Sequence, residues 1–457
     1  MPNKELLIKT LNHETPEKTP WVPFAGVHAG KLVGYSAKEV LTDGDKLYKA
    51  LLEVNKLYKP NGQPVLFDLQ LEAEILGCKL KWADDAPPSV ASHPYEGDEM
   101  ELPSDDLIPK ETDGRLPMVL DVMRRMKEAV GHDTLLYGLI CGPFTLAAHL
   151  RGNDIFMDMF DDDEYVHNLL DYCARVAAQV AEYYVNAGMD VIAVVDPLIS
   201  QISSNHFEEF MTEPFTSLFK KIKDMGAYSS FFVCGDATRN IEVMCHTKPD
   251  SISIDENVNL VKAKEITDKY NVALGGNIPL TTVMLLGNQL DNMKCAIDIL
   301  DSIKDKKNYI LAPGCDMPYD VPVENTIGVA QAAVEPDEVR KIVANYVAED
   351  EDIEVELPDY ESLKKPLIEI FTLDSETCAA CTYMKGAAVA AKERYGDKFD
   401  MVEYKYTVKE NIARCKKMGV PNLPSMYING QLKFRSIVPS SDELDAAIDE
   451  ALKSTGN

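Results

Sequence analysis

Short apolar segments that alternate with amphipathic stretches constrain the fold of this chain more than any other feature of its sequence. The apolar segments are rich in β-branched and aromatic residues, whereas stretches such as residues 165–187 and 207–225 place apolar residues at helical spacing. Strands that alternate with helices in this way form βαβ units and a parallel sheet. The clearest expected strands are residues 135–140, 191–195, 229–233, 251–254, 272–274 and 309–311.

Repetition of this unit favours a closed barrel. Over residues 1–345 the pattern predicts a TIM-type (β/α)8 barrel rather than an open, doubly wound sheet. The chain contains neither a Gly-x-Gly-x-x-Gly motif after a strand nor a Gly-x-x-x-x-Gly-Lys-Ser/Thr motif, so the sequence gives no support for a nucleotide-binding fold.

Polar side chains close most of the expected strands. Because the carboxyl ends of barrel strands converge on one mouth, where active sites lie, we expect these side chains to form one site. Taken singly, Cys141 is also compatible with a small buried residue, and Asp196 with a capping residue of a loop. The residues at these strand ends are Cys141, Asp196, Cys234, Asp255, Glu256, Asn277 and Cys315.

A boundary is expected after the barrel. Residues 349–361 read EDEDIEVELPDYE, with many acids, no basic residue and one proline, which is typical of a linker or an exposed edge. The sequence therefore predicts a barrel over residues 1–345, an acidic linker over 346–364 and a second domain over 365–457.

Charge and cysteine content narrow the classes of function. The formal net charge of −29 disfavours nucleic acid and anionic membranes as partners. The N-terminal segment MPNKELLIKT lacks the apolar core of an export signal, and no run of apolar residues is long enough to span a membrane. Ten cysteines in such a chain indicate a reducing compartment, so we expect a cytoplasmic protein.

Cys234, Glu256 and Cys315 end three different strands. Two thiolates and one carboxylate form a ligand set that zinc accepts, and three protein ligands leave one position open. A substrate thiol that binds there would lose its proton to the metal and become a nucleophile. The alternative is that both cysteines are inert thiols of the core.

Several longer segments of the first part of the chain stand out by their order and spacing. They are FDLQLEAEILGC (67–78), GLICGPFTLAAHLRG (138–152), VCGDAT (233–238), SISIDENV (251–258), GGNIP (275–279) and APGCDMPYDVPVENT (312–326). In this order they resemble the uroporphyrinogen decarboxylase superfamily and, within it, the corrinoid-dependent branch of methylcobamide:coenzyme M methyltransferases. The resemblance spans residues 4–335.

The resemblance implies a zinc site with one missing ligand. In that branch a His-x-Cys motif at a strand end and a later Cys bind zinc, and the similar cobalamin-independent methionine synthases add a Glu. Cys234, Cys315 and Glu256 match these positions, but Phe232 stands where the His is expected and cannot ligate. Either zinc binds the remaining three residues and a substrate thiolate, or the site holds no metal and the acceptor is an amine such as a folate.

The C-terminal part has its own pattern of elements. The pattern is a strand (367–372), a Cys-x-x-Cys pair that opens a helix, a strand (401–408), a helix, a hairpin around Asn429-Gly430 and a closing helix. This order resembles the thioredoxin and glutaredoxin family, and Pro424 matches that family's cis-proline. At a helix N-terminus the thiolate of Cys378 is stabilised, which makes Cys378 the expected nucleophile and Cys381 the resolving thiol.

Together these patterns predict an enzyme that transfers a methyl group from a methylated corrinoid protein to a thiol or pterin acceptor. We expect Asp196 and Asn277 to orient the acceptor. The Cys-x-x-Cys pair would keep Cys234 and Cys315 reduced, or would reduce a partner or a thiol substrate. The alternatives are a decarboxylase or lyase, and a non-catalytic redox adaptor that binds corrinoid. Residues 21–34 offer only Lys31 as a permanent cation, which disfavours uroporphyrinogen itself as the substrate.

Overall fold

The computed structural model describes residues 3–97, 99–348, 353–376 and 378–455. Its main feature is a curled sheet of seven parallel strands in the order β1-β4-β5-β6-β7-β8-β9, a half-barrel of the TIM type. All six strands expected for this part are present, together with β1. The strands are β1 (Gly62–Leu66), β4 (Leu135–Cys141), β5 (Val191–Val195), β6 (Tyr228–Val233), β7 (Ser251–Ile254), β8 (Ala273–Ile278) and β9 (Tyr309–Pro313).

The sheet has seven strands where the sequence predicts eight. The eighth position is taken by the segment around Trp21, which forms a single parallel bridge with Leu311. The N–H of Val22 donates to the carbonyl of Leu311 (3.0 Å), and the N–H of Asn61, just before β1, donates to the carbonyl of Trp21 (2.9 Å). The flanking residues Pro20 and Pro23 have no N–H to donate, which prevents a longer strand. This segment therefore joins the two edges of the sheet.

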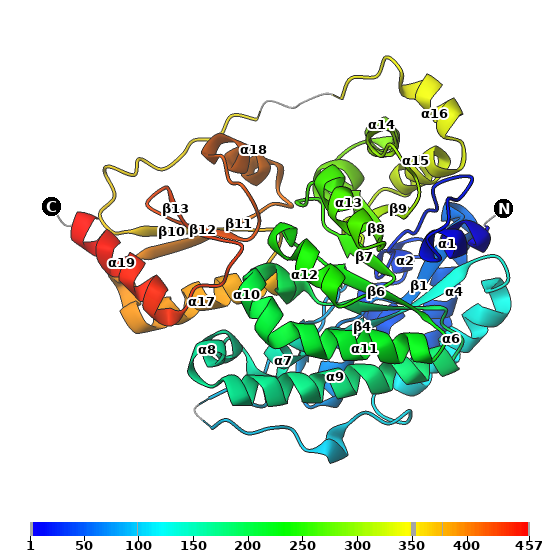
Figure 1. Cartoon of the computed structure of the whole chain (residues 1–457). Coiled ribbons are helices and arrows are strands. Elements are labelled where there is room, and N and C mark those ends of the chain that lie inside the picture. Colours follow the sequence, from blue (N-terminus) through cyan, green and yellow to red (C-terminus); the bar gives the residue numbers. More distant parts are fainter. Residues whose placement is uncertain (1–2, 98, 349–352, 377, 456–457) are drawn as a thin grey trace.

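Helices cover the outside of the sheet (Figure 1). Every residue of β4, β5, β7, β8 and β9 is buried, because their outer faces pack on these helices and their inner faces meet one another. The helices are α1 (Lys4–Leu11), α2 (His28–Lys31), α3 (Ala37–Thr42), α4 (Gly44–Tyr58), α5 (Leu71–Ile75), α6 (Leu116–Val130), α7 (Pro143–Arg151), α8 (Asp154–Asp161), α9 (Asp163–Asn186), α10 (Ser204–His206), α11 (Thr212–Asp224), α12 (Ile241–His246), α13 (Leu260–Lys269), α14 (Gln289–Ser302), α15 (Val323–Val334) and α16 (Pro336–Val343).

A second sheet follows the barrel, and we call the part from β10 to α19 the C-terminal module. Its four strands run in the order β11-β10-β12-β13, with β10 parallel to β11 and antiparallel to β12. The expected order of strands and helices is present. The elements are β10 (Leu367–Thr372), α17 (Ala379–Tyr395), β11 (Asp400–Lys405), α18 (Lys409–Met418), β12 (Ser425–Ile428), β13 (Gln431–Arg435) and α19 (Ser441–Thr455).

The acidic segment between the two parts has no helix or strand in its described residues, 353–366, and residues 349–352 lie outside the description. It runs along α18, where Arg414 and Lys417 donate hydrogen bonds to the carbonyls of Glu356 (3.0 Å) and Val355 (2.8 Å). Backbone carbonyls and basic side chains thus hold part of this segment on the C-terminal module.

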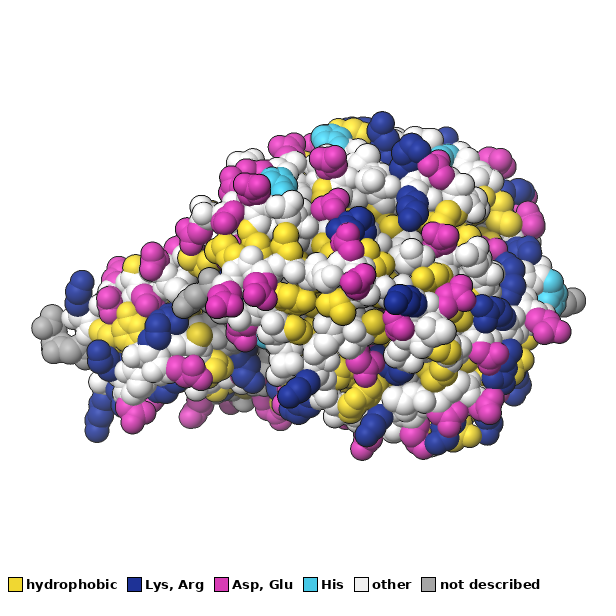
Figure 2. Space-filling model, turned by 90° about the horizontal axis from the view of Figure 1, so that it is seen from below, with side chains coloured by type: hydrophobic (Ala, Val, Ile, Leu, Met, Phe, Trp, Pro, Cys, Tyr) yellow, Lys and Arg dark blue, Asp and Glu magenta, His cyan; other side chains and the backbone are white. Residues whose placement is uncertain are grey.

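The surface carries mixed charge. Figure 2 shows Asp and Glu side chains interspersed with Lys and Arg side chains over the face seen from below. Within the described part of the chain, none of the helices combines the length and the hydropathy that a membrane span requires.

Candidate functional site at the rim of the sheet

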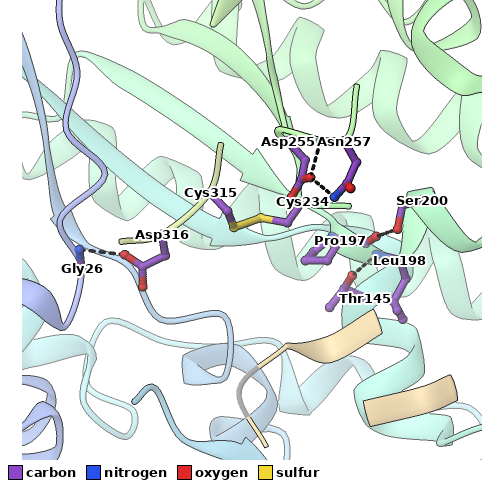
Figure 3. The surroundings of a disulfide bond; sticks show 10 residues. All are labelled: Gly26, Thr145, Pro197, Leu198, Ser200, Cys234, Asp255, Asn257, Cys315 and Asp316. Atoms are coloured by element: carbon purple, nitrogen blue, oxygen red, sulfur yellow. Dashed lines mark hydrogen bonds between the residues drawn. A yellow bond between two sulfur atoms is a disulfide. The ribbon is translucent and has the colours of Figure 1, made fainter. Parts of the chain in front are cut away.

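The carboxyl ends of the strands form one rim, and the structure brings Cys234 and Cys315 together there. Cys234 follows β6 and Cys315 follows β9, and their sulfur atoms are joined in a disulfide with the Cα atoms 5.6 Å apart (Figure 3). This Cα distance is ordinary for a disulfide. Both residues are half-buried, so the rim pair, defined as Cys234 and Cys315, is partly exposed. The predicted convergence of the two sulfurs is confirmed, but they are bonded to each other and are not thiolates.

An aromatic cluster lies directly under the disulfide. The Phe232 ring is fully buried and packs against Phe24 and Phe67, with ring centroids 4.6 and 5.8 Å apart. Cys234 and Cys315 pack on this same cluster. The Phe at the position expected for a His ligand therefore fills the interior of the sheet with apolar surface and offers the rim no nitrogen donor.

Glu256 lies beside the disulfide and has one free carboxylate oxygen. The N–H of Leu280 donates to its Oε1 (3.3 Å), whereas its Oε2 is buried and has no hydrogen-bond partner among the residues that the structure describes. A β-carbon at Gly314, the neighbour of Cys315, would lie only 2.5 Å from this Oε2. Burial, and then the charge of Asp255, raises the pKa of Glu256 well above its usual range. An unpartnered buried carboxylate oxygen is costly and marks a place for a ligand.

Asn277 positions the loop that carries Glu256. Its Nδ2 donates to the carbonyls of Asp255 (3.0 Å) and Val258 (2.8 Å). The Asp255 carboxylate in turn accepts hydrogen bonds from the backbone and side chain of Asn257 (2.9 and 2.5 Å). We expected Asn277 to orient the acceptor. In the structure its side chain instead holds the loop that carries Glu256.

The Asp196 carboxylate caps the N-terminus of helix α7. Its carboxylate accepts hydrogen bonds from the N–H groups of Phe144 (2.9 Å) and Thr145 (3.0 Å) and from the Thr145 hydroxyl (2.6 Å), in the first turn of α7. Complete burial raises the pKa of Asp196 to about 7 despite these bonds. Asp196 therefore makes the contacts of a capping residue. Cys141 is buried within β4, as expected for a small buried residue, and its N–H donates to the Glu72 carboxylate (3.0 Å).

The zinc set predicted from Cys234, Glu256 and Cys315 does not fit a metal ion in this form of the protein. Zinc binds cysteine as the thiolate, and both sulfurs are consumed by the disulfide. Across the residues that the structure describes, no group of three or more His, Cys, Asp or Glu side chains is arranged to hold a metal ion. Phe232 removes the remaining nitrogen donor. Only the free Oε2 of Glu256 still has the character of a ligand.

Two polar groups near the rim were missed by the sequence patterns. Asp316 follows Cys315, accepts a hydrogen bond from the N–H of Gly26 (2.8 Å) and has its pKa raised well above the usual range by burial. Arg115 pairs with the fully buried Asp68 (2.5 Å), which lies two residues past the carboxyl end of β1. The position of Asp316 directly after a strand-end cysteine was the available signal, whereas Arg115 is the N-cap of α6 and is far from any strand end in the sequence.

The Cys-x-x-Cys pair is a dithiol in the structure. Cys378 is the N-cap residue of α17, is half-buried and carries a free thiol, and Cys381 is buried with a free thiol. The N–H of Leu373 donates to the Cys381 sulfur (3.3 Å). Burial, followed by the hydrogen bond with Cys378, raises the pKa of the Cys381 thiol well above its usual range. The peptide bond before Pro424 is cis, as the resemblance to the thioredoxin and glutaredoxin family implies.

The C-terminal module packs on the rim at the cysteine loop. Asn422, two residues before Pro424, donates a buried hydrogen bond (2.7 Å) to Asp236, which lies two residues after Cys234. Helix α17 packs on the short 3₁₀ helix η2 (Pro197–Gln201), which follows β5. Ala380 and Tyr383 of α17 belong to the same apolar cluster as the barrel helices. The Tyr383 hydroxyl also lies 3.4 Å from Nδ1 of His149.

A curled parallel sheet with its polar side chains gathered at the strand carboxyl ends defines an α/β protein of the TIM-barrel class. Within that class, the chain belongs to the uroporphyrinogen decarboxylase (URO-D) family, whose family model matches residues 2–335. The match ends just before the acidic segment, so the C-terminal module lies beyond it.

Curated relatives carry two kinds of names. The chain is 26% identical over 337 residues to the "Methylcobamide:CoM methyltransferase MtbA" of Methanosarcina acetivorans, which covers 72% of this chain and 97% of the relative. It is 23% identical over 288 residues to a uroporphyrinogen decarboxylase of Prochlorococcus marinus, covering 61% and 80%. Among solved structures, a methyltransferase from Methanosarcina mazei shares the fold with a TM-score of 0.67 at 24% identity, covering 73% of this chain and 99% of that one.

Proposed function

We propose that the rim transfers a methyl group from a methylated corrinoid protein to a small thiol. The observation that carries this proposal is the meeting of Cys234 and Cys315 next to the unpartnered Oε2 of Glu256. The methylcobamide:CoM methyltransferase of Methanosarcina acetivorans named above supports it, because the match covers 97% of that relative. A pterin acceptor, the other possibility left open by the sequence, has no such support.

The residues of the rim supply orientation. Transfer of a methyl group from cobalt to sulfur is a displacement, so the enzyme must hold the acceptor sulfur in line with the methyl–cobalt bond. Glu256 and the reduced forms of Cys234 and Cys315 would contact the acceptor at the mouth, over the apolar floor formed by Phe232. Asn277 keeps the Glu256 loop in place. The aromatic floor excludes water from the underside of the site.

Zinc enters this proposal only for the reduced protein. When bound, zinc would supply Lewis-acid activation of the acceptor thiol. The disulfide form lacks the thiolates that such an ion needs, so the steps above are assigned to the side chains alone.

A decarboxylase is the second candidate, since a relative carries that name. The substrate of such an enzyme, if it were a porphyrinogen, would bring many carboxylates that need cations. Lys31, the one permanent cation of residues 21–34, is paired with Asp320 at 2.6 Å. This pairing favours the methyltransferase proposal.

For the C-terminal module we propose a thioredoxin-like redox function in which Cys378 attacks and Cys381 resolves. The order of its elements, the position of Cys378 as the N-cap of α17 and the cis peptide at Pro424 support this proposal. Eight free thiols fit a reducing compartment, which is the basis for proposing a cytoplasmic location.

The test is a demethylation assay. The full chain, reduced and then freed of reductant, is mixed with methylcobalamin and one candidate acceptor at a time: coenzyme M, homocysteine or tetrahydrofolate. We expect the visible spectrum to change to that of demethylated cobalamin with a thiol acceptor and to stay constant with the folate. A folate-dependent change, or no change with any thiol, would overturn the proposal, and release of CO2 from uroporphyrinogen would favour the decarboxylase.

A further inference from the structure

We propose that the Cys378–Cys381 dithiol reduces the Cys234–Cys315 disulfide of the same chain, so that the C-terminal module is an internal reductase for the rim of the sheet. The exchange itself does not depend on the proposed methyl transfer; only its purpose does. The starting point is that one chain holds two cysteine pairs in opposite states, a disulfide on the rim and a dithiol on α17.

The first argument is placement. The buried hydrogen bond from Asn422 to Asp236 ties the loop before Pro424 to the segment that begins at Cys234. Arg435 on β13 hydrogen-bonds to Asn422 and lies 3.8 Å from the same Asp236 carboxylate. The loop of the cis-proline, which in the proposed redox fold lies next to the cysteine pair, therefore sits beside the rim disulfide.

The second argument is the contact made by the cysteine helix itself. Helix α17 packs on η2, and Ser200 of η2 is so close to Gly235 that a β-carbon there would lie 2.7 Å from its Oγ. Gly235 follows Cys234 directly and has a positive φ of 92°, so this close approach requires a glycine. Figure 3 shows the η2 residues Pro197, Leu198 and Ser200 on the Cys234 side of the disulfide. One element of the C-terminal module thus contacts the stretch after Cys234 directly, through Asn422, and a second element, α17, packs on the η2 helix that lies against Gly235.

The third argument is access. Cys378 is half-buried, and so are Cys234 and Cys315, whereas Cys381 is buried. This is the distribution that exchange requires: the attacking thiol and the target bond are reachable, and the resolving thiol is protected until the first bond has formed. Cys378 and Cys315 also pack on one continuous apolar cluster.

The exchange balances within the chain. The Cys378 thiolate attacks one sulfur of the rim disulfide, forms a mixed disulfide with it and releases the other rim sulfur as a thiolate. Cys381 then loses its proton and attacks the Cys378 sulfur, which releases the second rim sulfur. Two electrons and two protons pass from the module to the rim, which leaves a Cys378–Cys381 disulfide and two rim thiols. An external thiol reductant is needed only to reset the module for another cycle.

The consequence is a rim that is switched by oxidation. In the disulfide form neither sulfur can bind a metal or contact a substrate as a thiolate. After exchange, two thiols stand next to the free Oε2 of Glu256, and the ligand set expected from the sequence is restored. A tethered reductant acts at a high effective concentration and needs no encounter with a second protein.

Trapping the mixed disulfide tests the proposal. In Cys381→Ser the resolving thiol is absent, so Cys378 should remain linked to Cys234 or Cys315. Full-length protein is isolated with the rim oxidised, acid-quenched, digested without reductant and analysed by mass spectrometry. We expect at least tenfold more Cys378-linked rim peptide than in the parent, where Cys381 resolves the link, and a yield unchanged by tenfold dilution. No linked peptide in the folded variant, or a yield that falls on dilution, would overturn the proposal.

Reduction kinetics provide a second measurement. With a limiting amount of dithiothreitol, the rate at which Cys234 and Cys315 become alkylatable should be at least fivefold lower in the Cys378→Ser/Cys381→Ser double variant than in the parent. Cys415→Ser, which removes another thiol of the module, should keep the parent rate. Equal rates in parent and double variant would exclude internal reduction.

The hydrogen bond between Asn422 and Asp236 allows a third test, with two Asn→Asp variants that differ only in position. Asn422→Asp places a second carboxylate against Asp236 and should slow rim reduction about threefold or more by loosening the module from the rim. Asn411→Asp, the same change within the module at a side chain whose amide donates to the carbonyl of Lys405 (3.0 Å), should leave the rate unchanged. Equal slowing by both variants would assign the effect to module stability and contradict the docking argument.

Discussion

The rim pair Cys234–Cys315 and the module pair Cys378–Cys381 consist of the same side chain in two different settings. The rim cysteines come from strand ends that are 81 residues apart in sequence and meet over an aromatic floor. The module cysteines lie three residues apart at the start of α17, one half-buried and one buried. The first setting brings distant sulfurs into bonding contact, whereas the second presents one thiol and hides the other. The difference shows that backbone topology decides the chemistry available to a cysteine.

The largest expected effect is the loss of methyl transfer when a cysteine of the rim pair is replaced. Cys234→Ser should lower the rate of methyl transfer to a thiol by about 100-fold or more, because a hydroxyl replaces a thiol at the reacting rim. Cys295→Ser on α14 is the matched control and should retain the parent rate. The assay is the spectral change of methylcobalamin with excess thiol. Equal activity of Cys234→Ser and the control would remove Cys234 from the reaction.

Oxidation state should control zinc binding at the rim. The reduced protein is expected to retain about one zinc ion after dialysis against buffer containing zinc, and the oxidised protein to bind at least tenfold less, because only thiolates ligate. Metal analysis of both forms checks this. Reduced Cys315→Ser should resemble the oxidised parent. Identical zinc content in all samples would show that zinc, if bound, lies elsewhere.

Loss of the Asn277 amide should affect the rim and leave the module intact. Asn277→Ala removes two hydrogen bonds to the loop that carries Glu256, which should lower kcat/KM about tenfold and the free energy of unfolding by about 2 kcal/mol. The rate of rim reduction by the module should change less than twofold. Activity loss without any loss of stability would mean that Asn277 contacts the substrate directly.

The smallest expected effect is a pH-dependent change in the stability of the C-terminal module, caused by Glu403, which contacts the loop before Cys378. Glu403 accepts hydrogen bonds from Lys385 (2.7 Å), Thr372 (2.6 Å) and the N–H of Ser375 (3.1 Å). Burial raises the pKa of Glu403, but these hydrogen bonds outweigh burial and lower the pKa to about 2. The folded-state pKa is below the unfolded one, so the stabilisation is present above about pH 4.5 and is lost as the pH falls towards 2.

Glu403→Gln should therefore reduce the free energy of unfolding of the module by about 1 kcal/mol at pH 7 and by about a quarter of that at pH 2.5. Denaturant titrations monitored in the C-terminal module at both pH values check this. The exposed Asp397, changed to Asn, serves as the control and should show no difference. A Glu403→Gln penalty that persists at low pH would indicate lost packing and not lost charge.

The sequence predicted the strand-end residues well because the period of a parallel β/α unit places the carboxyl ends of its strands at one edge. Cys234 and Cys315 therefore converge as expected. The sequence offered capping as one role for Asp196, but the partners of Asp196 and Asn277 could not be predicted, since the first turn of α7 and the Glu256 loop become their neighbours only after folding. The prediction of an eighth strand was wrong because Pro20 and Pro23 interrupt the segment around Trp21. Both prolines are visible in the sequence, but the repeated strand–helix pattern favoured a complete barrel.

By itself, the sequence determined the alternation of strands and helices, the cysteines at the strand ends and the order of elements around Cys378 and Cys381, because these depend on local periodicity and short-range turn chemistry. Only the tertiary structure decided that the rim cysteines are bonded to each other, that Glu256 keeps a free oxygen beside them, and that the C-terminal module docks on the same rim through Asn422 and Asp236. The physical reason is that bonding, burial and docking depend on distances between atoms of remote segments, which no local pattern encodes.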